Sequence, residues 1–411
     1  MQRSLFHLVI FALFVMSMLG MQWSLYKRSL TFMAELGMNS QLERRMIGVT
    51  RFFFLYLVSA GLISVILGFD SSGSAIIKYM IFYPLIIWLI SSFVTFLFIM
   101  IKEITVSIIA VSRKYIPYFP KIKVRREINF ADRRKFLQSG SLVSLGIAAA
   151  PVTTFGYGAI AAKLTPELNE VNIDIHGLPD ALQGLKIAQV SDLHTNQFIG
   201  ESEVERVTGL VMRENPDIII ITGDFVSNSQ KYIPICTSGL RGLSAPGGVF
   251  GCLGNHDYYT GAAEVRNQME SIGVNILVNS SAVVEVKGEK ITIAGIDDLW
   301  VGKPDLDSTL RDADKELPLI LMSHNPDIFP LSAKYDVDLT LSGHTHGGQV
   351  GLKFLGNNYS FVHLVTPFVS GEFKIGSSKL YVNRGIGTVG PPIRLNSTPE
   401  ITLFSLGRDN D

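Results

Sequence analysis

The sequence predicts two structural parts, a helical membrane region and a mixed α/β domain that follows it. Apolar residues crowd the first third of the 411-residue chain, and the remainder alternates short apolar runs with Gly, Asp, Asn and Pro. The first pattern is typical of transmembrane helices, and the second of short buried strands separated by polar turns. We therefore expect transmembrane helices and a basic cytoplasmic connection over residues 1–135, a fourth span or signal anchor over 136–163, and the α/β domain over 164–411.

Three stretches are long and apolar enough to cross a bilayer, at residues 5–25, 52–69 and 79–101. A fourth and weaker candidate, residues 136–162, carries no charge but is rich in Gly, Ala and Ser. Residues 102–120 are too broken to cross. They predict either an amphipathic segment at the membrane surface or a plain connecting helix.

The basic residues between these stretches predict their orientation, because Lys and Arg favour the cytoplasmic side. Five basic residues lie between the first two spans, none lies at residues 70–75, and ten lie between residues 102 and 135. The alternation is consistent with four spans. It places the α/β domain outside the cytoplasmic membrane.

A segment at the start of the fourth candidate span resembles a twin-arginine export signal. Arg133 and Arg134 are followed by Phe136, Leu137 and a weakly apolar run that ends at Ala150. The segment departs from such signals because Asp132 replaces the usual Ser or Thr and because it is internal. An ordinary juxtamembrane basic cluster is the alternative interpretation. The first interpretation implies export machinery as a partner, and cleavage after Ala150 stays open.

The overall charge and the cysteine content exclude several classes of protein. Lys and Arg number 36, as do Asp and Glu, so no global field favours nucleic acid and none is expected as a partner. The two cysteines, Cys236 and Cys252, exclude a disulfide framework. They predict two buried thiols, with a single bridge as the alternative.

The C-terminal part alternates strand-like and helix-like runs. Helical spacing appears at residues 201–214 and 263–272. Buried strands are predicted at residues 185–190, 217–221, 248–253, 291–294, 317–322, 339–341 and 380–382. Asp, Asn and His follow five of these runs directly. Because strand ends converge at one edge of an α/β sheet, these side chains predict a metal site.

Oxygen and imidazole donors without thiolate suit Mn, Fe, Zn or Mg rather than a structural zinc site. Each short motif alone is weak, since Gly-Asp after a strand is also ordinary turn chemistry. Their occurrence together indicates a metal site, because five of the eight histidines lie in these motifs. The motifs are Asp192-x-His194, Gly223-Asp224, Gly254-Asn255-His256-Asp257, Ser323-His324-Asn325 and Gly343-His344-x-His346.

In order and spacing these motifs resemble the signature of the calcineurin-like metallophosphoesterases. The sequence around them, over about residues 171–406, is similar to a bacterial membrane-associated or exported subgroup of these enzymes. The resemblance implies a four-layer α/β/β/α sandwich and two divalent metal ions. It implies that Asp192, His194 and His346 hold one ion, that Asn255, His324 and His344 hold the other, and that Asp224 bridges them.

The resemblance also implies a mechanism, in which a hydroxide that bridges the two metals attacks phosphorus. His256 would then protonate the leaving oxygen or neutralise phosphoryl charge, and Asp257 or another carboxylate would orient its ring. Arg384 or Arg394 is a candidate phosphate contact.

The leading hypothesis is a phosphoesterase of the bacterial cytoplasmic membrane, multi-pass, with its catalytic domain extracytoplasmic. It would hydrolyse phosphomonoester, phosphodiester or pyrophosphate bonds, and an anchored domain that faces a bilayer suggests lipid-linked or envelope substrates. The alternative is a metal-binding envelope protein or sensor with little turnover. A transporter would need charges along a membrane path, which His7 and Lys78 do not provide.

Overall fold

The structure, a computed structural model, divides into two compact units at residues 1–157 and 158–411. The described residues are 16–31, 40–66, 81–115, 153–154, 156–159, 165–227, 229–311, 313–314, 316–354 and 357–409. The arginine pair at 133–134 and most of the fourth candidate span lie outside these ranges, so the export signal and that span stay predictions.

Long helices make up the described part of the first unit. Residues 16–31 are helical, followed by α2 (Ser40–Ile66) and α4 (Tyr83–Tyr115). Aromatic side chains join them, because the Phe54 ring lies 5.2 Å from that of Tyr26 and 5.3 Å from that of Trp88. The Trp88 indole N–H also donates to Gln22 Oε1 at 2.9 Å. The N-terminal part is therefore helical, as its apolar runs predict.

Among the described residues, one helix is long and apolar enough to cross a bilayer, Tyr83–Ile109 within α4, with a mean hydropathy of 2.4. α4 continues without a break to Tyr115, so residues 102–115 are helical, which fits both an amphipathic segment at the membrane surface and a connecting helix. Crossing by the other expected spans stays a prediction.

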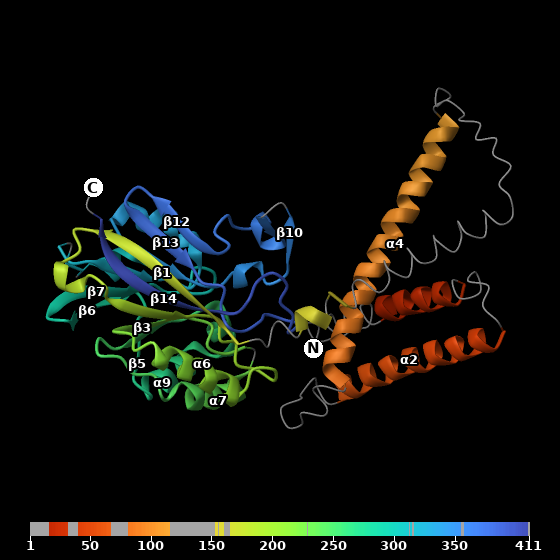
Figure 1. The fold of residues 1–411 in the computed structure, drawn as a ribbon, viewed down its shortest axis with the longest axis horizontal. Coiled ribbons are helices and arrows are strands. Elements are labelled where there is room, and N and C mark those ends of the chain that lie inside the picture. The colour runs from red at the N-terminus through yellow and green to blue at the C-terminus, as the bar shows by residue number, and fades with distance from the viewer. Residues whose placement is uncertain are drawn as a thin grey trace, which may run out of the picture. The chain divides into compact units, whose positions relative to one another are not determined.

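Two sheets of six strands form the framework of the C-terminal unit (Figure 1). The first has the order β1-β14-β2-β3-β4-β5, and its strands are β1 (Glu167–His176), β14 (Glu400–Asp409), β2 (Lys186–Val190), β3 (Ile218–Thr222), β4 (Val249–Cys252) and β5 (Val274–Ile276). The second has the order β12-β13-β9-β8-β7-β6, and its strands are β12 (Gly371–Ile375), β13 (Ser378–Val382), β9 (Leu339–Ser342), β8 (Leu319–Met322), β7 (Glu289–Gly295) and β6 (Ser280–Val286). A hairpin of β10 (Gly351–Phe354) and β11 (Asn357–Ser360) stands apart from both.

The seven strands expected from apolar runs are confirmed to within a few residues as β2, β3, β4, β7, β8, β9 and β13. Within each sheet, the strands that precede the polar motifs run parallel to one another. β2 pairs with β3 and β3 with β4 in the first sheet, and β8 pairs with β9 in the second. Their carboxyl ends therefore deliver the motifs to the same edge of each sheet.

Alternation along the strands explains the layers. In β3, Ile218 and Ile220 join the core shared with the second sheet, where they meet Ile293 and Ile320. Ile219 and Ile221 point the other way, into the core beneath the helices. Buried side chains that alternate between two faces are typical of a strand covered on both sides.

Helices cover the outer face of each sheet. α6 (Glu201–Arg213), α7 (Ile233–Leu240) and α9 (Ala262–Glu270) pack on the first sheet (Figure 1). α10 (Leu306–Leu310) and the 3-10 helix η4 (Pro326–Ile328) pack on the second. The remaining short helices are η2 (Asp180–Leu182), η3 (Gln230–Tyr232), α8 (Asn255–Thr260), α11 (Phe329–Ser332), η5 (Ala333–Tyr335), η6 (His346–Gly348) and η7 (Phe361–Leu364). Cys236 and Cys252 are buried free thiols, as expected.

Candidate metal centre

The seven predicted ligands gather where five strands end. They follow β2, β3 and β4 of the first sheet and β8 and β9 of the second, so each sheet supplies one side of the cluster. The cluster consists of Asp192, His194, Asp224, Asn255, His324, His344 and His346.

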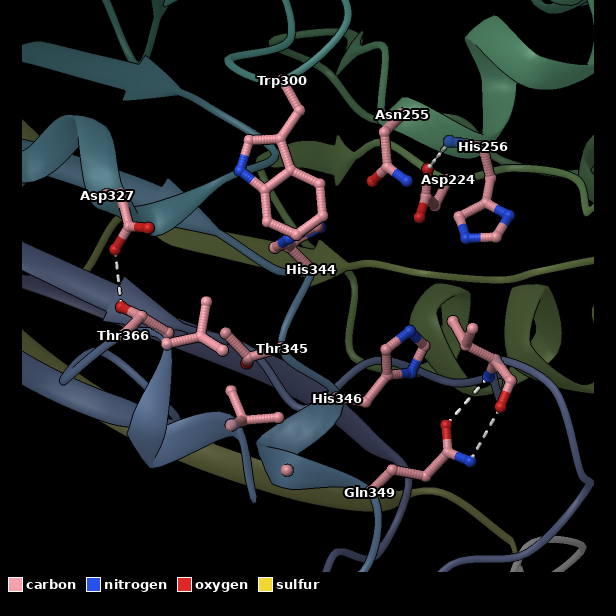
Figure 2. Close-up of a pocket in the computed structure, with 14 residues that line it drawn as sticks. Asp224, Asn255, His256, Trp300, Asp327, His344, Thr345, His346, Gln349 and Thr366 are labelled. Carbon is pink, nitrogen blue, oxygen red and sulfur yellow. Dashed lines mark hydrogen bonds between the residues drawn. The ribbon is translucent and has the colours of Figure 1, made fainter. Parts of the chain in front are cut away.

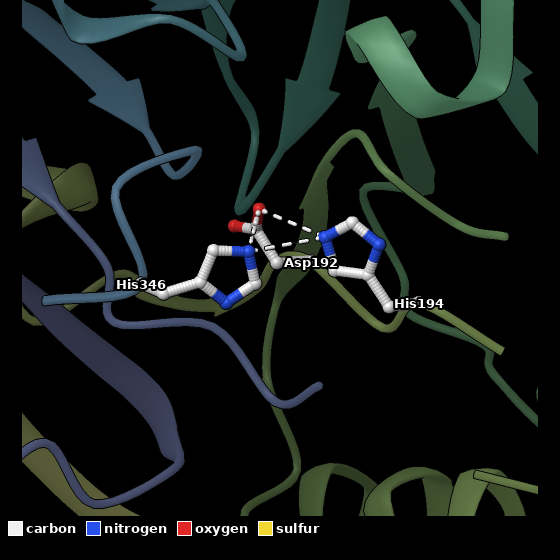
Figure 3. Close-up of side chains that lie close together, drawn as sticks. All are labelled: Asp192, His194 and His346. Atoms are coloured by element: carbon white, nitrogen blue, oxygen red, sulfur yellow. Dashed lines mark hydrogen bonds and ion pairs between the residues drawn. The ribbon is translucent and has the colours of Figure 1, made fainter. Parts of the chain in front are cut away.

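Three of these side chains converge in the interior (Figure 3). Asp192 Oδ1 lies 3.3 Å from His346 Nε2 and 3.7 Å from His194 Nε2, and the two Nε2 atoms are 3.1 Å apart. All three side chains are buried. One carboxylate oxygen and two imidazole nitrogens aimed at a common point match the donors of a divalent cation. We call these three residues the inner triad.

Asp224 lies between the inner triad and the remaining ligands. Its Oδ2 is 3.3 Å from His194 Nε2 and 3.1 Å from His324 Nε2. Its Oδ1 accepts a 2.8 Å hydrogen bond from the backbone N–H of His256. One carboxylate therefore faces imidazoles on both sides.

The other three ligands, Asn255, His324 and His344, form what we call the outer triad. His344 Nδ1 lies 3.1 Å from His324 Nε2. Asn255 Oδ1 is buried but has no hydrogen-bond partner among the described residues, and such an atom is costly unless another group satisfies it. An amide oxygen is a good ligand for a hard divalent cation. The donor set of the outer triad therefore fits a metal ion.

The protonation states also suit metal binding. Burial lowers the pKa of His346 to about 3, and burial together with the charge on His324 lowers the pKa of His344 to about 4. Both rings are neutral at pH 7, so each keeps a lone pair. Burial opposes the charge on His194 as well, but Asp224 and Asp192 raise its pKa to about 9. A divalent cation could displace that proton, because metal ions bind deprotonated ligands.

Hydrogen bonds behind the ligands fix the direction of the rings. Ser227 Oγ lies 2.6 Å from His194 Nδ1, and the Thr222 carbonyl lies 2.8 Å from His324 Nδ1. Both contacts occupy Nδ1 and turn Nε2 toward the cluster. Partners of this kind orient metal-binding histidines and set the tautomer.

The backbone of the cluster adopts conformations that non-glycine residues rarely take. Five of the seven ligands have a positive φ, namely Asp192 (50°), His194 (47°), Asp224 (54°), His344 (71°) and His346 (53°). Such strain persists where the surroundings impose it, and it is concentrated at functional sites. Gly343 shows how closely the segments pack, since a Cβ there would lie 1.9 Å from Ser191 Oγ.

Comparison with known proteins identifies the fold family. Residues 185–348 match the sequence model of the calcineurin-like phosphoesterases. The uncharacterized metallophosphoesterase YkuE of Bacillus subtilis is 35% identical over 296 residues, which are 68% of this chain and 99% of that protein. The chain belongs to the calcineurin-like phosphoesterase family.

Two further relatives extend this phosphoesterase comparison. Phosphodiesterase YaeI of Escherichia coli is 28% identical over 281 residues, 67% of this chain and 99% of that protein. A transmembrane protein with metallophosphoesterase domain from Danio rerio is 34% identical over 266 residues, 61% of this chain and 59% of that protein. Together with the ligand cluster, membership of this family makes the chain a metal-dependent hydrolase of phosphoric esters.

The structure corrects the role expected for Asp257. Its carboxylate does not orient the His256 ring but accepts backbone N–H groups from Gly254 and Asp224 at 2.9 Å and from Val226 at 3.3 Å. Burial and the nearby Asp224 raise its pKa to about 7. Asp257 therefore holds the β3 and β4 turns of the phosphoesterase together.

The two arginines expected near phosphate are engaged elsewhere. Arg384 pairs with Glu400 at 2.8 Å and with Glu167 at 2.9 Å. Arg394 is buried, and it donates to the Arg384 and Gly385 carbonyls and lies 3.3 Å from His346 Nδ1. The expected phosphate contact is wrong for Arg394, whose guanidinium supports the inner triad from behind.

A cavity of about 290 Å³ opens beside the outer triad of the phosphoesterase (Figure 2). Its polar lining includes Asp224, Asn255, His256, His344 and His346. Sequence reasoning missed Trp300, whose ring lies edge-on to that of His344 with 4.3 Å between centroids. No metal-ligand motif in the sequence indicates Trp300, because the position of its side chain at the site depends on how the loop after β7 folds.

Hydrogen bonds hold the Trp300 loop. Asp298 Oδ1 accepts from the backbone N–H groups of Trp300 and Val301 at 2.9 Å each. The Tyr258 hydroxyl of α8 donates to Asp297 in the same loop. The acidic pair before Trp300 is the signal that could have indicated a structured loop at the site.

Proposed function

We propose that the chain hydrolyses phosphodiesters with two divalent ions, one on the inner triad and one on the outer triad, with Asp224 shared between them. The position of Asp224 Oδ2, within 3.3 Å of imidazoles from both triads, is the observation that carries the proposal. The seven donors give each ion three ligands of its own and the shared carboxylate, and a coordination number above four would leave each ion a position for water.

The ions would supply a hydroxide nucleophile at neutral pH and would neutralise charge on the phosphoryl group. The residues of the chain hold the ligand directions and exclude water from the inner side. The net reaction adds water across one P–O bond, so the products are a phosphomonoester and an alcohol, and the departing oxygen must gain a proton.

The position of His256 supports a role for it as the donor of that proton. It is half-buried on the cavity wall, and its ring lies edge-on to that of His194 with 4.7 Å between centroids. Its Nδ1 has no hydrogen-bond partner among the described residues, so the ring has no competing contact at that nitrogen. An imidazole beside the leaving oxygen can act as a general acid.

We further propose that the enzyme is anchored in the bacterial cytoplasmic membrane with its catalytic unit outside. The apolar Tyr83–Ile109 helix supports anchoring, as do exposed side chains on it such as Phe93, Phe98 and Ile108. A continuous exposed apolar surface is costly in water and stable in lipid. A reporter fused to the C-terminus tests the orientation, and activity of a cytoplasmic reporter there would contradict it.

Turnover of bis(p-nitrophenyl) phosphate by the purified full-length protein tests the catalytic proposal. We expect Mn²⁺-dependent hydrolysis that EDTA abolishes, and we expect Asp224→Asn to lower kcat by about 1,000-fold because both ions lose a shared ligand. Asp180→Asn, which changes an exposed carboxylate paired with Arg408, should leave kcat unchanged. Metal binding without turnover of any monoester, diester or pyrophosphate would favour a metal-binding sensor instead.

The leaving group tests the role of His256. A diester with an alkyl leaving group needs protonation, whereas p-nitrophenolate departs without it. We expect His256→Ala to lower turnover of the alkyl diester by about 100-fold or more and to change p-nitrophenyl turnover much less. Equal losses on both substrates would show that His256 acts on the phosphoryl group rather than on the leaving oxygen.

A further inference from the structure

An apolar projection stands beside the cavity. It consists of η7 (Phe361–Leu364) and the following Val365, between β11 and β12. The exposed fractions are 86% for Phe361, 83% for Leu364 and 70% for Val365. Large apolar side chains this exposed and this close together are typical of an interaction surface.

Hydrogen bonds fix the projection to the metal-binding turn. Thr345, which lies between two histidine ligands, donates from Oγ1 to the Val369 carbonyl at 2.6 Å. Thr366 donates from Oγ1 to Asp327 Oδ1 at 2.6 Å. A Cβ on Gly348 would lie 2.2 Å from Ser360 Oγ, so the two segments are in close contact. The apolar side chains are therefore held in a fixed position relative to the catalytic ligands.

The projection is continuous with the catalytic cavity. Val362 and Val365 line the same cavity as Asp224 and His344. Val365 thus contributes both to the cavity wall and to the exposed surface. An apolar chain attached to a phosphoryl group at the metal ligands could leave the cavity along these two valines.

The charge of this region indicates what covers it. From His344 to Gly371 the sequence contains no Asp or Glu, and Lys353 is its single Lys or Arg. A surface without carboxylates is not repelled by anionic lipid headgroups, and exposed Phe and Leu gain free energy by entering the acyl boundary. The apolar Tyr83–Ile109 helix in the same chain supports proximity to a bilayer.

We propose that η7 and Val365 dock on a phospholipid bilayer, and that the substrate is an amphiphilic phosphodiester drawn from that surface. The substrate class rests on the proposed phosphodiesterase function, whereas the docking of η7 and Val365 on a bilayer does not depend on it. An acyl chain would pass from the bilayer along Val362 and Val365 while its phosphodiester reaches the metal ligands.

A fluorescent label at the projection tests the docking surface directly. Both native cysteines are fully buried, so Phe361→Cys can be labelled selectively in the full-length protein. In nanodiscs of phosphatidylcholine and phosphatidylglycerol, we expect blue-shifted emission and quenching by brominated acyl chains. The matched control is Val283→Cys on β6, where Val283 is 51% exposed, and this label should show neither effect.

Two other results would overturn the docking proposal. Blue-shifted emission without lipid quenching would mean that protein covers the projection, either the N-terminal helices of the same chain or a second copy. Emission unchanged from an exposed label would mean that the projection stays in water.

Kinetics test the substrate class. In Mn²⁺-loaded full-length protein, the double variant Phe361→Ser/Leu364→Ser should lower the ratio of phospholipid turnover to bis(p-nitrophenyl) phosphate turnover by about tenfold, because the substrate must be taken from the bilayer. The control variant Val283→Ser/Ile375→Ser, which changes exposed apolar residues on β6 and β12, should leave the ratio unchanged.

The outcomes separate the two proposals. Hydrolysis of the soluble diester with an unchanged ratio in the double variant would overturn the amphiphilic substrate alone. Absence of hydrolysis of either diester would overturn the phosphodiesterase function, while quenching of the label at position 361 would still decide the docking surface.

Discussion

The inner and outer triads have similar ligands but different surroundings. Asp192, His194 and His346 are buried, with Arg394 behind them. Asn255 and His324 of the outer triad are buried as well, but His344 is half-buried and lies against Trp300. Asn255 and His344 both line the cavity, whereas His346 is the one member of the inner triad that does so. Ligands that water cannot reach hold an ion rigidly, whereas ligands beside a cavity permit exchange of ion, water and substrate. We infer that the inner triad is the tighter site and that the outer triad receives the substrate.

Removal of one histidine from each triad is the strongest test of this difference. We expect His194→Ala to lower kcat by about 1,000-fold at every Mn²⁺ concentration, because His194 is buried and does not line the cavity, so water from the cavity cannot take its place. His344→Ala should lose activity at low Mn²⁺ and recover part of it at high Mn²⁺, because water from the cavity can occupy the vacant position. Metal content per chain and kcat against Mn²⁺ concentration measure both effects.

The same titration can contradict the comparison. If the two variants retain equal metal and recover equally with Mn²⁺, burial does not distinguish the triads. His176→Ala is the matched control, since this exposed histidine ends β1 and lies outside the cluster, the cavity and the projection.

Much of the inner and outer triads could be predicted from sequence because each ligand follows an apolar strand. Chain order cannot show that β2, β3 and β4 belong to one sheet while β8 and β9 belong to another, because strand pairing is non-local. It also gave no strand at β1 or β14. β14 pairs between β1 and β2, more than 200 residues away in the sequence.

Other features of the site depend on tertiary structure alone. Arg394 lies in a sequence without apolar periodicity, and arginine is rarely buried, so the sequence suggested a phosphate contact rather than a buried guanidinium. The sequence does not indicate the positive φ values of Asp192 and Asp224, although Asp adopts this region more readily than most residues. Trp300 and the η7 projection likewise acquire their roles from neighbours distant in the chain.

Arg394 offers a second and smaller test of the inner triad. Its guanidinium lies 3.3 Å from His346 Nδ1 and donates to Gly385 and Gly387 carbonyls in the loop behind Asp192. Burial lowers its pKa to about 9, so the group stays charged at pH 7. We expect Arg394→Met to weaken binding of the tighter ion by about 10- to 100-fold, the usual cost of losing a residue that supports a ligand, because the Gly385 and Gly387 carbonyls in the loop behind Asp192 lose their donor. Calorimetric titration with Mn²⁺ measures the change.

Arg394→Lys and Arg384→Met make the Arg394 test specific. Lysine keeps the charge but cannot reach the same carbonyls in the planar geometry of arginine, so it should restore only part of the affinity. Arg384→Met removes an arginine from the same loop whose partners are Glu400 and Glu167 rather than a ligand. Its Mn²⁺ affinity should match that of the unaltered protein. An equal loss in Arg384→Met would mean that general loop stability, and not the hydrogen bonds from Arg394 to Gly385 and Gly387, sets the affinity.

Glu400 gives the smallest expected effect and separates support of the fold from support of the metal. Burial alone would raise its pKa, but the adjacent Arg384 brings it below the ordinary value of 4.5. A carboxylate with a depressed folded-state pKa stabilises the fold above its unfolded value, and this stabilisation is lost as pH falls through the folded-state pKa. Glu400→Gln should therefore lower the free energy of unfolding by about 1.5 kcal/mol at pH 7 and by less below pH 4.5, with kcat of the folded enzyme unchanged. Denaturant titrations of both proteins across this pH range measure the difference. A difference independent of pH would show that Glu400 acts through its hydrogen bonds to Tyr381 and Asn169 rather than through its charge.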